Sequence, residues 1–368
     1  MSQVLVKAPS GGGDVPPFFE GTEKRIEVDF HGTGDLRKIP RSDWEDVVRL
    51  SSTQILNEMR GEHQLSYLLS ESSLIVYPRK AILKTCGRTV PICSVWKIHE
   101  LGRKIGLEPE WLCYSRKDFL NPSEQPWEHQ SQEREITLCR SACRGKGDAY
   151  VLGSLTGEHW MIYDAQFKAT DCTKTADFTI DVMMYELPAH VRQAFFTEEP
   201  EGSAKGAAQM TKASGLGSLV DYMGGEIDDY CFAPCGYSCN VHAGEAYATV
   251  HVTPQESCSY ASFETNFGSR RLSKPGEDVS RTLNEVVGKV LDIFQPKRLT
   301  ITLFIDQGAE ASIGNAPFEA AEKRYAQRTK TSTRFEMDYA ATIANYVSTS
   351  HKREREENGE EPSPANKK

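Results

Sequence analysis

The chain has 368 residues, 39% hydrophobic and 26% charged, a composition typical of a globular protein with one large or two smaller domains. Its formal net charge of -9 argues against non-specific binding to nucleic acid or anionic lipid. No apolar run approaches the ~20 residues that span a membrane, and the N-terminus lacks the features of a secretory signal. We therefore expect a cytosolic protein.

The two ends of the chain and one internal stretch differ in composition from the rest. Residues 8–17, "APSGGGDVPP", predict a flexible leader, and the charged stretch 351–368 predicts a disordered tail. The small and polar stretch 198–217 predicts a long surface loop or a join between two halves. The letters alone do not show whether the two halves are related.

The remaining segments alternate strand and helix patterns, which favours an α+β fold of antiparallel sheets faced by helices. A hairpin turn is expected at Thr156-Gly157-Glu158. Alternating apolar and polar residues predict strands at 24–30, 73–77, 81–86, 149–155, 160–167, 246–253, 259–265 and 298–305. Helical periodicity occurs at 42–60, 93–105, 188–197 and 280–294.

One strand pattern is interrupted at an unexpected point. In "LLSESSLIVYPRK" (68–80) two apolar runs flank Ser70-Glu71-Ser72-Ser73. An unpaired hydroxyl or carboxylate drawn towards a core costs a few kcal/mol. Such a placement suggests a chemical purpose.

Three further clusters carry reactive side chains. They are "LKTCGRT" (83–89), "CFAPCGYSCN" (231–240) and "ATVHVTPQE" (248–256). The spacing of the cysteines in the second cluster is close to that of an iron–sulfur loop. However, the position of the last thiolate is Ser238, whose hydroxyl is no substitute for a soft ligand. With no C-x-x-C pair in the chain, no metal site is expected.

Each cluster taken alone has a structural explanation that we favour over a functional one. The serines could lie at a strand entry, Cys86 could be a buried thiol and His251 a core histidine. The acidic residues of "FFEGTEKRIEVDF", Glu20, Glu23 and Glu27, could be solvated. Only the combination of the clusters favours function.

The combination resembles one family. "FFEGTEKRIEV", "LLSESSLIVYPRKAILKTCGRT", "FAPCGYSCN" and "HVTPQESCSYASFETN" are similar, in this order, to the signature segments of eukaryotic S-adenosylmethionine decarboxylase. The resemblance covers the chain from about Phe18 to about Tyr346. It implies a single domain at 18–350 with a four-layer α/β-β/α sandwich of two antiparallel sheets between helices.

The resemblance implies a self-processing enzyme that decarboxylates S-adenosylmethionine to the aminopropyl donor of spermidine and spermine synthesis. Its members cut themselves at the bond matching Glu71-Ser72, which here gives a β chain 1–71 and an α chain 72–368. Ser72 becomes a pyruvoyl group that forms a Schiff base with the substrate, without metal or pyridoxal phosphate. Ser238 and His251 match the residues that assist cleavage, and Cys86 matches the proton donor.

The substrate-binding residues of the family have matching residues in this chain, except at two positions. Phe19 and Phe232 match the aromatic residues that sandwich the adenine ring, and Leu69 matches a backbone contact to adenine. Glu20 and Glu23 match carboxylates needed for activity or processing. The ribose-binding glutamate of the family is Gln255 here, so the contact is either weaker or shifted to Glu256. The usual Asn or Asp before Pro-Cys-Gly-Tyr-Ser is Ala233.

A regulatory site also has matching positions. In animal members an acidic cluster binds putrescine as an activator, and this chain keeps acceptors for it at Glu27, Asp177, Thr179, Asp181 and Glu264. Arg25, however, stands where plant members have arginine and animal members an apolar residue, while the second plant arginine corresponds to Cys113. We expect Arg25 to neutralise the cluster, unless it merely pairs with an exposed glutamate.

Two matters stay open at this point. Animal and plant members differ in assembly, so either a monomer or a homodimer of cleaved units is compatible with the resemblance. The alternative function is a non-processing regulatory homologue that activates a catalytic partner. Regulators of that kind in trypanosome-type families lack the self-cleavage serine, which this chain keeps as Ser72.

Overall fold

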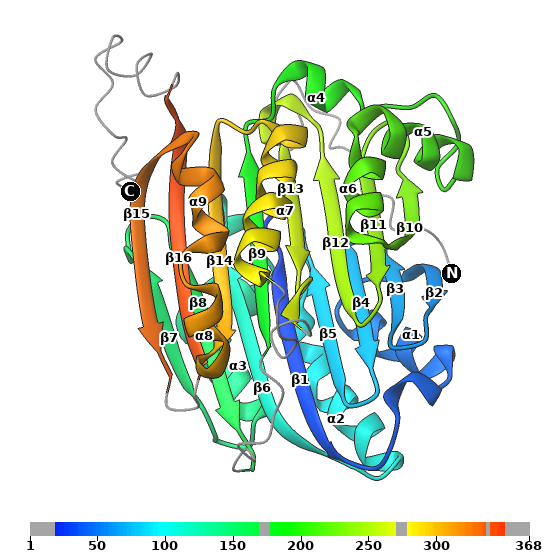
Figure 1. Cartoon of the computed structure of the whole chain (residues 1–368). Coiled ribbons are helices and arrows are strands. Elements are labelled where there is room, and N and C mark those ends of the chain that lie inside the picture. Colours follow the sequence, from blue (N-terminus) through cyan, green and yellow to red (C-terminus); the bar gives the residue numbers. More distant parts are fainter. Residues whose placement is uncertain (1–18, 169–176, 270–277, 336–338, 350–368) are drawn as a thin grey trace.

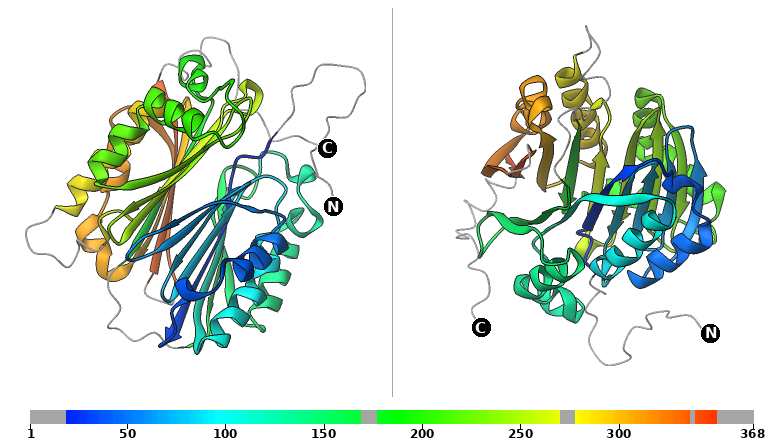
Figure 2. Two further views of the ribbon diagram at one scale, coloured as in Figure 1. Left: turned by 90° about the vertical axis from the view of Figure 1, so that its right-hand side faces the viewer. Right: turned by 90° about the horizontal axis from the view of Figure 1, so that it is seen from below.

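The computed structural model describes residues 19–168, 177–269, 278–335 and 339–349. The predicted leader and tail lie outside the described residues. Within them, two eight-stranded antiparallel sheets face each other, and helices cover their outer faces (Figures 1 and 2). The expected α+β sandwich is confirmed. Among the described residues, no helix is both long and apolar enough to cross a membrane.

Sheet A is built from the first half of the chain, in the order β2-β3-β4-β5-β1-β6-β8-β7. Its strands are β1 (Lys24–Gly32), β2 (Ile55–Arg60), β3 (Leu65–Leu69), β4 (Ser72–Tyr77), β5 (Lys80–Thr85), β6 (Leu107–Lys117), β7 (Asp148–Gly153) and β8 (His159–Gln166). Its helices are α1 (Arg41–Leu50), α2 (Val95–Lys104) and α3 (Gln132–Ala142), with the 3-10 turns η1 (Leu36–Lys38), η2 (Pro91–Ser94), η3 (Pro122–Glu124) and η4 (Trp127–His129).

Sheet B is built from the second half, in the order β10-β11-β12-β13-β9-β14-β16-β15. Its strands are β9 (Phe178–Tyr185), β10 (Glu226–Cys231), β11 (Tyr237–Ala243), β12 (Ala246–Thr253), β13 (Tyr260–Thr265), β14 (Arg298–Asp306), β15 (Tyr325–Arg334) and β16 (Tyr339–Ser348). Its helices are α4 (Ala189–Gln193), α5 (Ala204–Ser214), α6 (Leu216–Met223), α7 (Val279–Phe294), α8 (Gln307–Ile313) and α9 (Ala316–Glu322), with the 3-10 turn η5 (Glu256–Cys258).

The two halves share one topology. Each strand of sheet B occupies the place of the strand numbered eight lower in sheet A. The internal relation that the letters could not demonstrate is therefore visible in the strand order.

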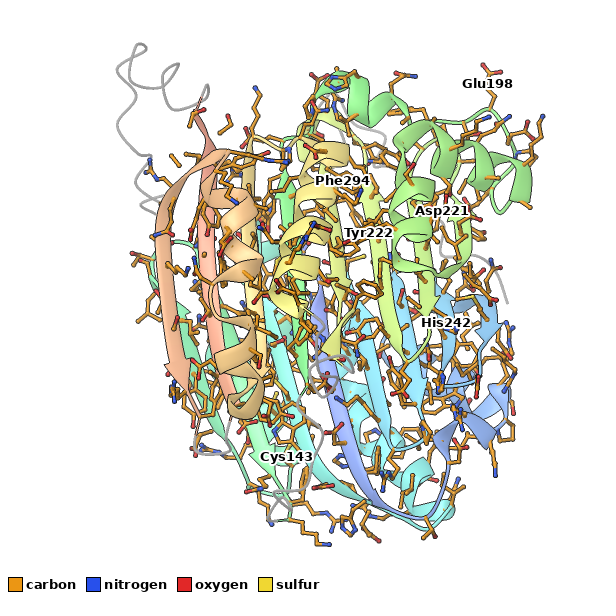
Figure 3. All side chains as sticks on the ribbon, viewed as in Figure 1. Cys143, Glu198, Asp221, Tyr222, His242 and Phe294 are labelled. Atoms are coloured by element: carbon orange, nitrogen blue, oxygen red, sulfur yellow. The ribbon has the colours of Figure 1, made fainter. Side chains whose placement is uncertain are left out.

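The two large apolar cores lie between each sheet and its own helices. Cys143 after α3 belongs to the core of sheet A, and Phe294 at the end of α7 belongs to that of sheet B (Figure 3). Strand β1 shows which side chains lie on the opposite face of sheet A, away from its helices. Ile26 and Val28 enter the core of sheet A, so the intervening Glu27 points towards sheet B. Polar side chains of both sheets thus meet in the middle of the sandwich.

Two predicted elements are wrong. The helix expected at 42–60 ends at Leu50, and 55–60 forms β2. The stretch 198–217, expected to be a loop or a join between two halves, contains α5 and the start of α6 and lies within the second half. Ser203 caps α5 by accepting a hydrogen bond from the Gly206 N–H. Met210, a residue of this helix, is buried. The helices expected at 93–105 and 280–294 are confirmed as α2 and α7, whereas 188–197 contains only the short α4.

Candidate active site

The Glu71–Ser72 bond lies in the tight turn between β3 and β4. Leu69 pairs with Ser72, which leaves two residues to form the turn. Ser72 has a φ of 112°, a left-handed value that costs a residue with a Cβ on the order of 1–3 kcal/mol. Its side chain is buried, and its Oγ has no hydrogen-bond partner among the residues that the structure describes. A hydroxyl without a hydrogen bond to the described residues therefore lies next to the Glu71–Ser72 bond, on a residue with a strained backbone.

Cys86 follows the end of β5 and contacts Glu71 twice. Its backbone N–H donates to the Glu71 carbonyl oxygen at 3.1 Å, and its thiol donates to Glu71 Oε2 at 3.7 Å. Burial, reinforced by the charge of Glu71, raises the pKa of Cys86 well above its usual value. Burial also raises the pKa of Glu71 to about 7. Near neutral pH the thiol keeps its proton, so it can act as an acid.

His251 is held between two serines from different sheets. On sheet B it pairs with Ser238, whose Oγ lies 2.9 Å from His251 Nδ1. On sheet A, Ser73 Oγ lies 3.1 Å from His251 Nε2 and donates to Asn240 Oδ1 at 2.6 Å. Because Ser73 donates to Asn240, it accepts from Nε2–H, and Nδ1 is left to accept from Ser238. This network assigns the tautomer of His251.

The charge state of His251 follows from its surroundings. Burial first, and then the positive charge of Lys84, lower the pKa of His251 well below its usual value. The imidazole is therefore neutral near pH 7 and has a lone pair at Nδ1, as a base requires.

The segment before β1 runs beside Cys86. The Gly87 N–H donates to the Glu20 carbonyl oxygen at 2.8 Å, and the Glu20 carboxylate accepts from the Asn121 N–H at 3.1 Å. Burial raises the pKa of Glu20, and its Oε1 has no partner. Glu23 accepts hydrogen bonds from Tyr260 (2.7 Å) and Ser262. Both glutamates are buried, so the expectation that they would be solvated is wrong.

Gly87 lies where Phe19 and Glu71 pack closely against the backbone. Its φ of 61° is left-handed, and a Cβ there would lie 3.0 Å from the Phe19 ring and 3.2 Å from Glu71 Oε2. Phe19, Glu71 and the turn after Cys86 thus meet at one point. The sequence "CGR" fits the geometry because glycine alone fits both this conformation and this space comfortably.

The other predicted contact residues lie on neighbouring segments. Leu69 is buried at the end of β3, and Phe232 follows β10 in the loop that leads to Ser238. Gln255 follows β12, and its Oε1 is buried without a partner in the described part of the chain, whereas Glu256 is exposed beside Arg192 at 3.4 Å. The inward polar group is therefore Gln255, which favours it over Glu256 as a ligand contact.

An ion network continues from the site through the middle of the sandwich. Arg25 contacts Glu27 at 2.6 Å and Glu264 at 3.2 Å, and both carboxylates are buried. The suggestion that Arg25 pairs with an exposed glutamate is therefore wrong. Burial alone would raise the pKa of Glu27, but Lys80 and Arg25 outweigh it and hold the pKa at about 2. Burial raises the pKa of Asp181 to about 8, against a smaller opposing effect of Lys84.

Two lysines of β5 complete the network. Lys84 is almost fully buried and contacts Glu264 at 3.2 Å and Asp181 at 3.8 Å. Lys80 contacts Glu27, and lies 3.0 Å from Asp177 and 3.7 Å from Asp29. Thr179 lines the cavities beside both ends of this network. The predicted acidic cluster is therefore brought together, with its own cations among the acids.

Sequence reasoning missed four residues of this region: Ser73, Lys80, Lys84 and Asn240. A signal was available for Lys84, because it precedes Cys86 by two residues and shares its face of the strand. The partners of Ser73 and Asn240 lie on the opposite sheet, and no local pattern identifies them.

Comparisons with known proteins agree on one family. Residues 16–347 match the family model described as adenosylmethionine decarboxylase. The chain is 33% identical over 351 residues to the S-adenosylmethionine decarboxylase proenzyme of Dictyostelium discoideum, covering 92% of this chain and 88% of that protein. It is 32% identical over 317 residues to the proenzyme of Xenopus laevis, covering 83% and 88%.

A solved structure has the same architecture. The crystal structure of the Trypanosoma brucei AdoMetDC-delta26 monomer superposes with a TM-score of 0.55 at 25% sequence identity. The match covers 75% of this chain and 98% of that one.

Proposed function

Because the chain belongs to the adenosylmethionine decarboxylase family, and is an S-adenosylmethionine decarboxylase, we propose that it makes its own pyruvoyl group from Ser72. The observation that carries the proposal is the buried Ser72 hydroxyl, which has no hydrogen-bond partner among the described residues, on a residue with a strained φ. A buried polar atom without a partner costs about 1–3 kcal/mol, so its presence calls for a chemical reason.

Self-cleavage begins when Ser72 Oγ attacks the carbonyl carbon of Glu71 and the acyl group moves from nitrogen to oxygen. The Cys86 N–H already donates to the Glu71 carbonyl oxygen, where negative charge develops. His251 then removes the α-proton of Ser72, and its neutral state supports this role. Ser238 assists through its hydrogen bond to His251.

When formed, the pyruvoyl ketone holds the substrate amine and accepts the electron pair left by departing CO2. The chain's own residues do the rest. Cys86 delivers a proton to the substrate carbon that has lost CO2, a role that its high thiol pKa supports. Delivery to that carbon matters because protonation elsewhere leads to transamination and an inactive enzyme.

Substrate binding uses residues around the same turn. Phe19 and Phe232 hold the adenine ring between them, and their faces attract the sulfonium with ~0.5–2 kcal/mol. Leu69 contacts adenine through its backbone, and Gln255 offers its unpartnered amide oxygen to the ribose. Glu20 also has an unpartnered carboxylate oxygen, which supports a role for it near the substrate.

Intact mass after purification tests the proposal. We expect two fragments, residues 1–71 and 72–368, the second lighter by one ammonia than a chain that begins with serine. Active material that consists of one uncut chain with an ordinary serine at position 72 would refute the proposal. A denaturing gel also distinguishes the enzyme, with two bands, from a regulatory homologue, with one. The regulatory homologue is not favoured, since the relatives are named proenzymes.

We also propose that the chain's own cations replace putrescine. Lys80 and Arg25 occupy the acidic cluster in which a diamine would bind, and Glu27 is ionised between them. Lys80 additionally reaches Asp177, at the edge of the cluster. Cleavage and decarboxylation should therefore need little or no putrescine.

Removing the ammonium of Lys80 tests this substitution. Lys80→Ala leaves Glu27, Asp29 and Asp177 without their shared cation, so activity should fall and added putrescine should restore it severalfold. The control Lys205→Ala removes an exposed lysine and should behave like the unmodified chain. Severalfold stimulation of the unmodified enzyme, assayed with and without putrescine, would count against the proposal.

The organisation that follows from this function is one domain over 18–350, cleaved into 1–71 and 72–368, in the cytosol. The contacts between β3 and β4 support continued association of the fragments, because their register pairs Leu69 with Ser72 directly across the cut.

A further inference from the structure

The decarboxylation reaction needs a supply of protons, a requirement that rests on the proposed function. Decarboxylation replaces a carboxylate by hydrogen and therefore consumes one proton in every turnover. If Cys86 donates that proton, its thiolate must be reprotonated before the next cycle. Cys86 is only 8% exposed, so direct contact with bulk water is limited. A neighbouring group must then pass the proton inward.

Glu71 has the position for this task. Its Oε2 lies 3.7 Å from Cys86 Sγ, within hydrogen-bonding distance for sulfur. Unlike Cys86, Glu71 is partly exposed, so it can exchange protons with solvent. The backbone contact between Cys86 N and Glu71 O, at 3.1 Å, fixes the two residues relative to each other.

The surroundings of Glu71 favour a protonated carboxyl group. Burial raises its pKa to about 7, and Cys86 and Lys24 lower it to a smaller extent. Lys24 on β1 donates to Gly87 O and to Gln125 Oε1, both at 2.9 Å. Glu135, Glu20 and Glu23 are the other carboxylates whose charge acts on Lys24 or Cys86. Cleavage would add an α-carboxylate to Glu71, whose negative charge raises the side-chain pKa further.

We propose that the Glu71 carboxyl group reprotonates the Cys86 thiolate in each catalytic cycle. The substrate carbon gains its hydrogen as the S–H bond of Cys86 breaks. The thiolate then takes the proton of the Glu71 O–H, and the resulting carboxylate takes one from water. Transfer from Glu71 to the thiolate is downhill, because the thiol has the higher pKa.

The first test is the pH dependence of kcat, expressed per pyruvoyl-bearing fragment counted by mass, so that slower cleavage does not enter. Glu71 must be protonated to donate, so kcat of the wild type should be highest below pH about 7 and fall above it. Glu71→Gln should lose this limb and about tenfold to a hundredfold of kcat, less than the ~10²–10⁴-fold of a general acid that acts on the substrate itself. Glu71→Asp keeps an acid and should retain the limb. Glu62→Gln removes an 88% exposed carboxylate and serves as the control.

The second test needs neither cleavage nor turnover. In the uncut Ser72→Ala chain, Cys86 alkylation by iodoacetamide is followed by peptide mass as a function of pH. An ionised Glu71 opposes thiolate formation, so adding Glu71→Gln should accelerate alkylation severalfold at the same pH. Equal alkylation rates in the two chains would show that the groups are not coupled and would overturn the relay.

The outcomes separate the relay from the function on which it rests. A wild type that neither cleaves nor decarboxylates contradicts the proposed function. A wild type that does both, with kcat independent of pH from 6 to 8 or with Glu71→Gln fully active, contradicts only the relay. More inactivation events per turnover in Glu71→Gln would support it, because a Cys86 that remains a thiolate leaves the substrate carbon to be protonated elsewhere or not at all.

Discussion

Replacing Ser72 with alanine is expected to give a single uncut chain of 368 residues without decarboxylase activity. The substitution removes the hydroxyl of the residue that follows the proposed cleavage bond. Ser73 cannot take over, because its Oγ is engaged by Asn240 and His251. Gel electrophoresis and release of CO2 from carboxyl-labelled substrate measure the two effects.

The same variant should fold normally. Ser72 Oγ makes no hydrogen bond to any described residue, so its loss removes a buried unpaired group and should leave the thermal midpoint equal or higher. Ser70→Ala is the matched control: it removes a hydroxyl from the same turn that accepts from the Gln54 N–H, and it should still be cut. A Ser72→Ala chain cut at the wild-type rate would show that another nucleophile acts.

The second large effect is expected for Cys86→Ala, which should cleave itself but turn over on the order of 10²–10⁴ times more slowly. Cleavage should survive because the Cys86 contact to the Glu71 carbonyl comes from the backbone N–H, which alanine keeps. Turnover should fail because the thiol that faces Glu71 is lost.

Inactivation during reaction separates a proton donor from a packing residue. Without the thiol, the substrate carbon is protonated elsewhere, and the Cys86→Ala enzyme should lose activity within fewer turnovers than the wild type. Cys93→Ala, at a half-buried cysteine in η2, serves as the control and should keep both rate and lifetime. A fully active, long-lived Cys86→Ala enzyme would remove the thiol from the mechanism.

Local signals identified several elements and part of the site. The period-2 pattern of β1 and the helical period of α7 were readable because each buries one face against a single core. The stretch 42–60 misled because its apolar spacing suits a helix, although it divides into α1 and β2 at Leu50–Ile55. In 198–217, small polar residues concealed α5, whose buried residues are Gly206, Ala207 and Met210.

A sequence reveals the residue roles that a family resemblance carries. It does not reveal the roles that depend on packing. The motif around Ser72 was recognisable from its order with Cys86, Ser238 and His251. Ser73, Asn240 and the lysines of β5 belong to no such pattern. Ser73 and Asn240 are distant in the chain and meet only because strands β4 and β11 face each other across the sandwich.

By itself the sequence determined the order of the reactive segments and the alternation that builds each strand, and its family resemblance led to the proposed cleavage bond. The tertiary structure alone decided that Arg25 and Glu27 face a second sheet instead of water, and that Arg25 reaches Glu264 there. The physical reason is that a period of two separates the faces of a strand without stating what covers them. Packing two sheets together removes water from the charged face, and the buried charges are then stabilised by partners distant in the chain.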